Sequence, residues 1–152
     1  MPQSVARVAL HLVYSTKNRV PLLKSGEIRQ QLYAYIATTL KEQVDSPAII
    51  IGGVEDHIHI LCSLSRKYPI MKLIEESKKE STKWLKKQDS TLSEFSWQNG
   101  YGAFGVSESH VPDVKRYIAN QVEWHQKLSF QDEFRRLCER HGIDLDEKYA
   151  WD

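Results

Sequence analysis

Cysteine is scarce in this sequence of 152 residues, and its scarcity excludes two kinds of architecture. The two cysteines, Cys62 and Cys138, are too few for a disulfide framework or a four-cysteine zinc site. We interpret both as small buried hydrophobic residues of a protein in a reducing cytoplasm. The composition, 41% hydrophobic and 27% charged, is that of an ordinary globular protein and excludes a disordered or fibrous chain.

Long hydrophobic runs are also lacking. The most apolar stretch, residues 48–54, is far too short to cross a bilayer. Polar residues interrupt residues 1–17, so the apolar core of a signal peptide is missing. We therefore expect a cytoplasmic protein that does not act at a membrane.

Net charge is nearly absent, but the charges are unevenly distributed. The formal net charge of +1 does not by itself indicate a nucleic-acid-binding protein. Residues 66–87, however, carry eight basic and three acidic side chains, whereas residues 131–152 carry four basic and seven acidic ones. A basic helix with a tryptophan suits a phosphate backbone, although a solvated helix face is the simpler alternative. The candidate DNA-binding residues are Arg66, Lys67, Lys78, Lys79, Lys83 and Trp84.

The hydrophobic pattern predicts strands and helices that alternate along the chain. Strands are expected at residues 5–15, 48–53, 57–63 and 101–107, and helices at residues 27–43, 69–88, 109–128 and 130–141. This order, with hairpin-type connections, predicts an α+β fold, an antiparallel sheet with helices on one face as in a ferredoxin-like sandwich. We expect one domain over residues 1–152, with a core at about 5–128 and a C-terminal helix and acidic tail at 129–152.

Two histidines, His57 and His59, flank Ile58 in the strand expected at 57–63. Because side chains alternate along a strand, both imidazoles project from one face and Ile58 from the other. Two neutral imidazoles at this spacing can hold one metal ion. An ordinary pair of core or surface histidines is the alternative, and for this motif alone it is the more frequent one.

A tyrosine and a glutamine lie four residues apart in the helix expected at 109–128. This spacing places Tyr117 and Gln121 on one helix face. A tyrosine hydroxyl can act as a covalent nucleophile, and a glutamine carbonyl oxygen can be a third ligand for a hard cation. Taken alone, a tyrosine on a helix is more often a half-buried packing residue.

Four blocks of sequence, in this order, resemble the single-tyrosine HUH transposases of small insertion sequences and their REP-associated relatives. The blocks are HLVYSTKNRVPLL at 11–23, EDHIHIL at 55–61, WQNGYGAF at 97–104 and YIANQVEWH at 117–125. Gly105 is one departure, since the resemblance leads us to expect serine there. The histidine motif is loosely specific alone, whereas the four blocks together are highly specific.

The resemblance implies a DNA transposase that cleaves and rejoins single-stranded DNA, with Tyr117 forming a 5′-phosphotyrosine link. It further implies that His57, His59 and Gln121 hold a divalent metal ion, Mg²⁺ or Mn²⁺, of which Mn²⁺ fits imidazole better. Members of the family bind hairpins at the ends of the element. They also work as homodimers in which the histidines of one subunit meet the tyrosine helix of the other, and a hinge at 108–112 is compatible with this.

Several alternatives stay open at the level of sequence. The chain could be a domesticated relative that acts on chromosomal repeats, a two-histidine phosphohydrolase that uses water, or a DNA-binding module without chemistry. His125, one turn beyond Gln121, either supports the site or is an exposed helix residue. Glu55 and Asp56 either orient the histidines or form the hairpin turn, and we favour the turn.

Overall fold

The computed structural model describes residues 2–151, and its strands form one antiparallel sheet in the order β2-β3-β1-β4. The elements are β1 (Ala9–Ser15), α1 (Gly26–Val44), β2 (Ala48–Gly53), β3 (His57–Ser63), α2 (Ile70–Gln88), β4 (Gly102–Val106), α3 (Val111–Ala119), α4 (Gln121–Trp124) and α5 (Phe130–Arg140). The predicted α+β antiparallel fold is confirmed. No helix among residues 2–151 combines the length and the apolarity needed to cross a bilayer.

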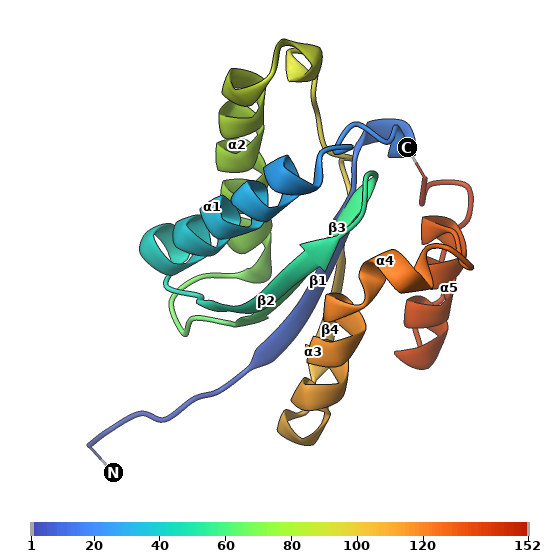
Figure 1. Ribbon diagram of the computed structural model, residues 1–152. Helices are drawn as coiled ribbons and strands as arrows, with labels where there is room; N and C mark the ends of the chain where they lie inside the picture. The colour runs from blue at the N-terminus through green and yellow to red at the C-terminus, as the bar shows by residue number, and fades with distance from the viewer. Residues whose placement is uncertain (1, 152) are drawn as a thin grey trace.

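The two long helices, α1 and α2, cover one face of the sheet (Figure 1). Alternate residues of β1 and β3 point toward them, among them Leu12, Tyr14, Ile58 and Ile60, all fully buried. The N-terminus of α1 is capped by Ser25, whose hydroxyl accepts a hydrogen bond from the amide of Ile28 at 3.2 Å. This face is therefore the main apolar core, and it holds the sandwich together as the sequence pattern predicts.

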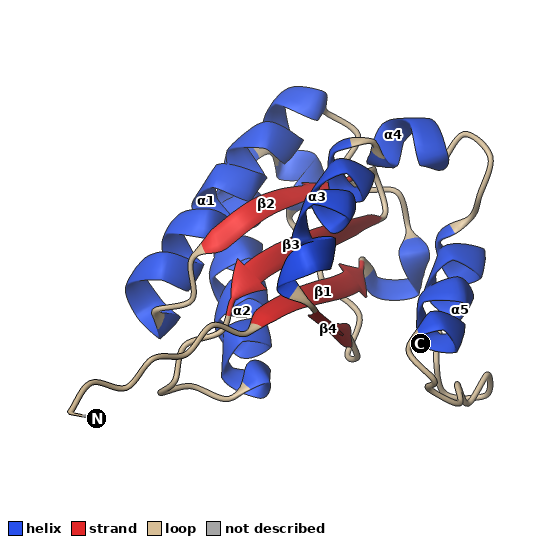
Figure 2. Cartoon of the chain, turned by 90° about the horizontal axis from the view of Figure 1, so that it is seen from below, coloured by secondary structure: helices blue, strands red, loops and turns tan. Residues whose placement is uncertain are grey.

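The C-terminal helices α3, α4 and α5 lie over the opposite face, so helices flank the sheet on both sides and not on one face as expected from the sequence (Figures 1 and 2). A smaller apolar cluster joins Val13 of β1 and Phe104 of β4 to Phe130 and Leu137 of α5. α3 approaches β2 so closely that a Cβ at Gly52 would lie 2.6 Å from the carbonyl oxygen of Ile118. Gly52 thus allows α3 to lie directly on the sheet.

The predicted continuous helix at 109–128 is wrong, because the helix breaks at Asn120. Asn120 adopts φ −103° and ψ 22°, and its amide bonds to the carbonyls of Arg116 and Tyr117. Asparagine is a weak helix former whose side chain competes for backbone hydrogen bonds. The chain consequently turns after α3, and the four-residue α4 carries Gln121 and Trp124 onward.

Candidate active site

The two histidines of β3 lie on the face of the sheet that α3 and α5 cover. His57 and His59 are fully buried, and their ring centroids are 5.2 Å apart. Ile58 between them belongs to the apolar core on the opposite face. The two-residue period of the strand thus gives the site two adjacent imidazoles aimed in one direction.

Tyr117 and Gln121 come to these histidines from α3 and α4. The centroid of the Tyr117 ring is 5.7 Å from that of His59, and the Gln121 Oε1 atom is 3.2 Å from Nε2 of His57. Despite the break at Asn120, both side chains face the sheet. The structure therefore brings together all four side chains singled out in the sequence, within a single chain.

Glu133 of α5, which the sequence interpretation missed, lies at the centre of this group. Its Oε1 atom is 3.2 Å from Nε2 of His57 and 3.0 Å from Nε2 of both His59 and His125. The carboxylate is almost wholly buried. His125, left open by the sequence, thus belongs to the cluster.

The second oxygen of the same carboxylate faces the tyrosine. Oε2 of Glu133 accepts hydrogen bonds from Nε2 of Gln121, at 3.0 Å, and from the hydroxyl of Tyr117. One carboxylate therefore joins the imidazole cluster to the candidate nucleophile.

Two further side chains bond the outer nitrogens of the histidines. The Nδ1 atom of His57 lies 2.6 Å from Oδ1 of Asp56, and Nδ1 of His59 lies 2.8 Å from Nε2 of His11. Such bonds orient the rings and select the tautomer that presents Nε2 to the site. Asp56 therefore orients a histidine as well as standing at the turn, and His11 is a buried site residue that the sequence did not single out.

Burial and hydrogen bonding shift the titration of these groups in opposite directions. Burial would lower the pKa of His57, but the bonds to Asp56 and Glu133 outweigh it and raise the pKa to about 9. Burial lowers the pKa of His59 despite the bond to Glu133, and burial with the neighbouring His59 lowers that of His11. The imidazoles of His59 and His11 are therefore neutral near pH 7.

The pKa values of Glu133 and Tyr117 are also shifted. Burial alone would raise the pKa of Glu133, yet bonds from His125, His57 and His59 hold it well below its usual range. Burial and the negative charge of Glu133 raise the pKa of Tyr117 above its ordinary value. In the absence of other charges, Tyr117 is therefore a protonated hydrogen-bond donor.

The donor set fits a divalent metal ion. One donor atom from each of His57, His59, His125 and Glu133 lies within 4.8 Å of the other three. Imidazole nitrogens, with that of His57 free of its proton, and one buried carboxylate are ligands that Mn²⁺ and Zn²⁺ accept more readily than Mg²⁺, which prefers oxygen. Three inward-facing Nε2 atoms around one carboxylate oxygen are the observation that supports a metal site.

The candidate DNA-binding residues lie on or near α2, on the side of the sheet opposite the histidines. Lys79 and Lys83 form ion pairs along the helix with Glu76 and Glu80. The ammonium group of Lys78 donates to the carbonyls of Gln98 and Gly100 at 2.7 and 2.8 Å, so it holds a loop.

Of the same set, Trp84 stacks on Tyr35 with ring centroids 5.6 Å apart. Arg66 and Lys67 are exposed in the connection between β3 and α2. No bound nucleic acid tests these residues, and their contact with DNA stays a prediction.

A sequence signal for Glu133 does exist in retrospect. Phe130, Glu133 and Leu137 share the buried stripe of α5, three and four residues apart. A charged residue on an otherwise apolar stripe needs a buried partner. His11 gives a similar signal, because it lies among apolar residues of a strand whose side chains are all buried.

The sequence matches a known protein family. The family model of the IS200-like transposases matches residues 4–121, more than three quarters of the chain. The chain therefore belongs to the IS200-like transposase family, whose members are DNA-cleaving enzymes. No curated protein matches the sequence.

Two solved structures share the fold. One is described as a transposase from Deinococcus radiodurans R1, with a TM-score of 0.61 and 20% identity over 80% of this chain and 95% of that chain. The other is a REP-associated tyrosine transposase bound to a REP hairpin, with a TM-score of 0.61 and 14% identity over 84% of this chain and 74% of that chain. At these identities the likeness concerns the fold alone.

Proposed function

We propose that this transposase cleaves and rejoins single-stranded DNA through a covalent bond between Tyr117 and a DNA phosphate. The observation that carries the proposal is the hydroxyl of Tyr117, hydrogen-bonded to a carboxylate that also contacts three imidazoles. A nucleophile, a proton acceptor and a metal-binding donor set thus lie within one buried cluster.

In the cleavage step the oxygen of Tyr117 forms a bond to phosphorus, and the bond between phosphorus and the 3′-oxygen breaks. Oε2 of Glu133, which accepts the hydrogen bond of the hydroxyl, takes the phenolic proton as the new bond to phosphorus forms, because that bond makes the proton far more acidic than it is in the free phenol. The departing 3′-oxygen keeps the bonding electron pair and takes up a proton. The DNA 5′-phosphate stays attached to Tyr117, and a 3′-hydroxyl of another DNA end reverses the step without an external energy source.

The residues that would hold a divalent cation are His57, His59 and His125, together with Glu133 and the carbonyl oxygen of Gln121. When bound, the cation supplies positive charge next to the phosphate and the developing phenolate. Asp56 and His11 orient the rings of His57 and His59 through hydrogen bonds to their Nδ1 atoms. The chain thereby holds its donors in place before DNA arrives.

We also propose that the DNA substrate carries a hairpin at the end of a mobile element. Support comes from the REP hairpin in the related complex and from the basic segment that includes Arg66 and Lys67. DNA bound there would have to pass around an edge of the sheet to reach Tyr117. Loss of hairpin affinity in Arg66→Gln/Lys67→Gln, with adduct formation on hairpin-free DNA unchanged, would support this path.

The homodimer implied by the resemblance needs a separate test, because Tyr117 lies against the histidines of its own chain. This arrangement favours sites formed within one chain. We expect a mixture of Tyr117→Phe and His59→Ala chains to remain inactive. Activity restored by mixing would instead indicate that subunits exchange their tyrosine helices.

The decisive experiment seeks the covalent adduct directly. The protein is incubated with Mn²⁺ and single-stranded DNA from both flanks of its own gene, and a protein–DNA species that survives denaturation is scored. We expect the wild type and Tyr149→Phe, which removes a hydroxyl from an exposed tyrosine, to form it. Tyr117→Phe should form none while still binding the DNA.

A metal-dependent phosphohydrolase is the competing function. It would cleave DNA without an adduct, and Tyr117→Phe would leave its activity unchanged because water is then the nucleophile. This outcome would refute the proposed function. A domesticated relative would use the same chemistry and differ only in the DNA on which it acts.

A further inference from the structure

Two arginines of α5, Arg136 and Arg140, line a cavity together with Tyr117. Arg136 and Arg140 are four residues apart and therefore share a face of the helix. Among residues 2–151, neither guanidinium group forms an ion pair with a carboxylate. Arg135 of the same helix differs, because it pairs with Asp132 at 2.9 Å and Glu147 at 2.7 Å.

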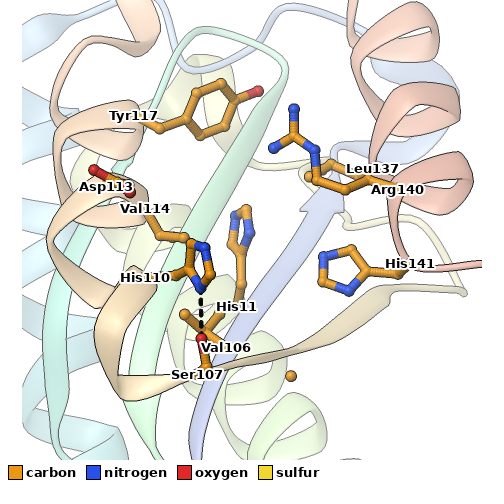
Figure 3. A pocket seen from close by; sticks show the side chains of 11 residues that line it. His11, Val106, Ser107, His110, Asp113, Val114, Tyr117, Leu137, Arg140 and His141 are labelled. Carbon is orange, nitrogen blue, oxygen red and sulfur yellow. Dashed lines mark hydrogen bonds between the residues drawn. The ribbon is translucent and has the colours of Figure 1, made fainter.

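Tyr117, Leu137 and Arg140 lie between two cavities, of about 610 Å³ and about 130 Å³, because all three residues line both. Arg136 lines only the smaller cavity, as does Glu133. In Figure 3 the side chain of Arg140 extends from α5 toward the ring of Tyr117. A strand that crossed from one cavity to the other would pass the hydroxyl and the guanidinium together.

The larger cavity has the chemistry of a nucleotide site. Its volume lies in the range of small-ligand pockets. His11, His110 and His141 contribute polar ring edges, while Val106, Val114 and Leu137 contribute apolar surface. Its one carboxylate, Asp113, is paired with Arg116. Apolar walls suit a base, and an uncompensated arginine suits a phosphate.

We propose that Arg140, with Arg136 beside it, binds the phosphate that Tyr117 attacks, and that the larger cavity holds the adjoining nucleotide with its base unstacked. This inference rests on the proposed function. The planar guanidinium can donate two parallel hydrogen bonds to phosphate oxygens. Its charge also offsets the repulsion between the phosphate and the carboxylate of Glu133. A base in the cavity must leave a duplex stack, which agrees with a single-stranded substrate.

The test compares Arg140→Gln, Arg140→Lys and Lys41→Gln, the last removing one exposed charge from α1. Single-turnover adduct formation is measured with the flanking DNA, and metal affinity by calorimetry. We expect Arg140→Gln to slow adduct formation by about 100-fold or more, because it removes a donor to the transition state. Arg140→Lys should be intermediate, and Lys41→Gln should match the wild type. Metal affinity should be unchanged in all three.

A second measurement does not depend on the chemistry. Binding of a short oligothymidylate, which has no hairpin, is measured in chelator with Tyr117→Phe as the parent protein. We expect Arg140→Gln to weaken this binding by about tenfold, the effect of losing one charge-assisted contact, and Lys41→Gln to leave it unchanged.

The two proposals can fail separately. If Tyr117→Phe abolishes the adduct but Arg140→Gln forms it at the wild-type rate, the phosphate site is refuted and the proposed function stands. If Tyr117→Phe still cleaves DNA, the proposed function fails, and the oligothymidylate result alone decides the phosphate site. Unchanged oligothymidylate binding in Arg140→Gln would then overturn it.

Discussion

The two faces of the sheet are formed by alternating residues of the same strands, yet they bury opposite kinds of side chain. Toward α1 and α2, β3 presents Ile58 and Ile60. Toward α3 and α5, the same strand presents His57 and His59. Apolar side chains need only to be covered, whereas buried imidazoles need hydrogen-bond partners. This is why the second face depends on a carboxylate, Glu133, from a helix far away in the sequence.

Stability and chemistry are thus assigned to opposite faces of one sheet, because successive side chains of a strand point to opposite sides. The apolar face contributes free energy of folding through burial. The polar face gathers charged and titratable groups, whose burial costs free energy unless each is paired. Sites of this kind are retained for function at some cost in stability.

The largest expected effect comes from removing a ligand on the polar face. His59→Ala should reduce metal-dependent adduct formation by at least about 100-fold, because it removes positive charge from the reacting phosphate. Calorimetry should show lost metal affinity, and Gln121→Ala should be milder because water can replace an amide oxygen. Full cleavage by His59→Ala, or by the wild type in chelator, would contradict a role for metal.

The neighbouring residue on the other face should behave in the opposite way. Ile58→Ala should lower the free energy of unfolding by about 2–5 kcal/mol, because it leaves a cavity in the main core. Metal affinity and adduct formation per folded molecule should stay close to the wild type. Denaturant unfolding and calorimetry measure the two quantities, and a matching loss of metal affinity would show that the faces are not independent.

The hydrogen-bonded imidazole of His57 makes the stability of the folded chain depend on pH. Its pKa of about 9 in the folded chain exceeds the ordinary value of 6.5. In the metal-free protein this group therefore contributes up to about 3 kcal/mol to the free energy of unfolding below pH 6.5. The contribution is lost as the pH rises through 9. Urea unfolding in chelator at both pH values, compared with His57→Asn, isolates this group. If the free energy of unfolding depends on pH equally in the wild type and in His57→Asn, His57 does not cause the dependence.

The contact between α3 and the sheet gives the smallest of these effects. A methyl group at Gly52 would meet a backbone oxygen of Ile118, so Gly52→Ala should lower the free energy of unfolding by about 1–3 kcal/mol. It should also slow adduct formation, because Tyr117 precedes Ile118. Gly105→Ala is the matched control for stability, since a Cβ there meets no atom within 4 Å. Equal unfolding curves for both variants would show that α3 can move away from the added methyl group without loss of stability.

Gly105 also shows how a sequence departure is judged by structure. The resemblance favours serine at this position, and a missing side chain can alter the packing of a strand. The open space around Gly105 means that packing does not require glycine there. The difference therefore leaves β4 and its pairing with β1 intact.

Much of the site follows from the sequence alone, because strand and helix periods act over a few residues. The strands 48–53 and 57–63, the shared direction of His57 and His59, and the shared side of Tyr117 and Gln121 can all be read from local patterns, whereas the roles expected of these residues come from the family resemblance. Only the tertiary structure decides that His125 belongs to the site, places Glu133 at its centre, and makes His11 a partner of His59. Which helix crosses which strand depends on the packing of the whole chain, and no local period encodes it.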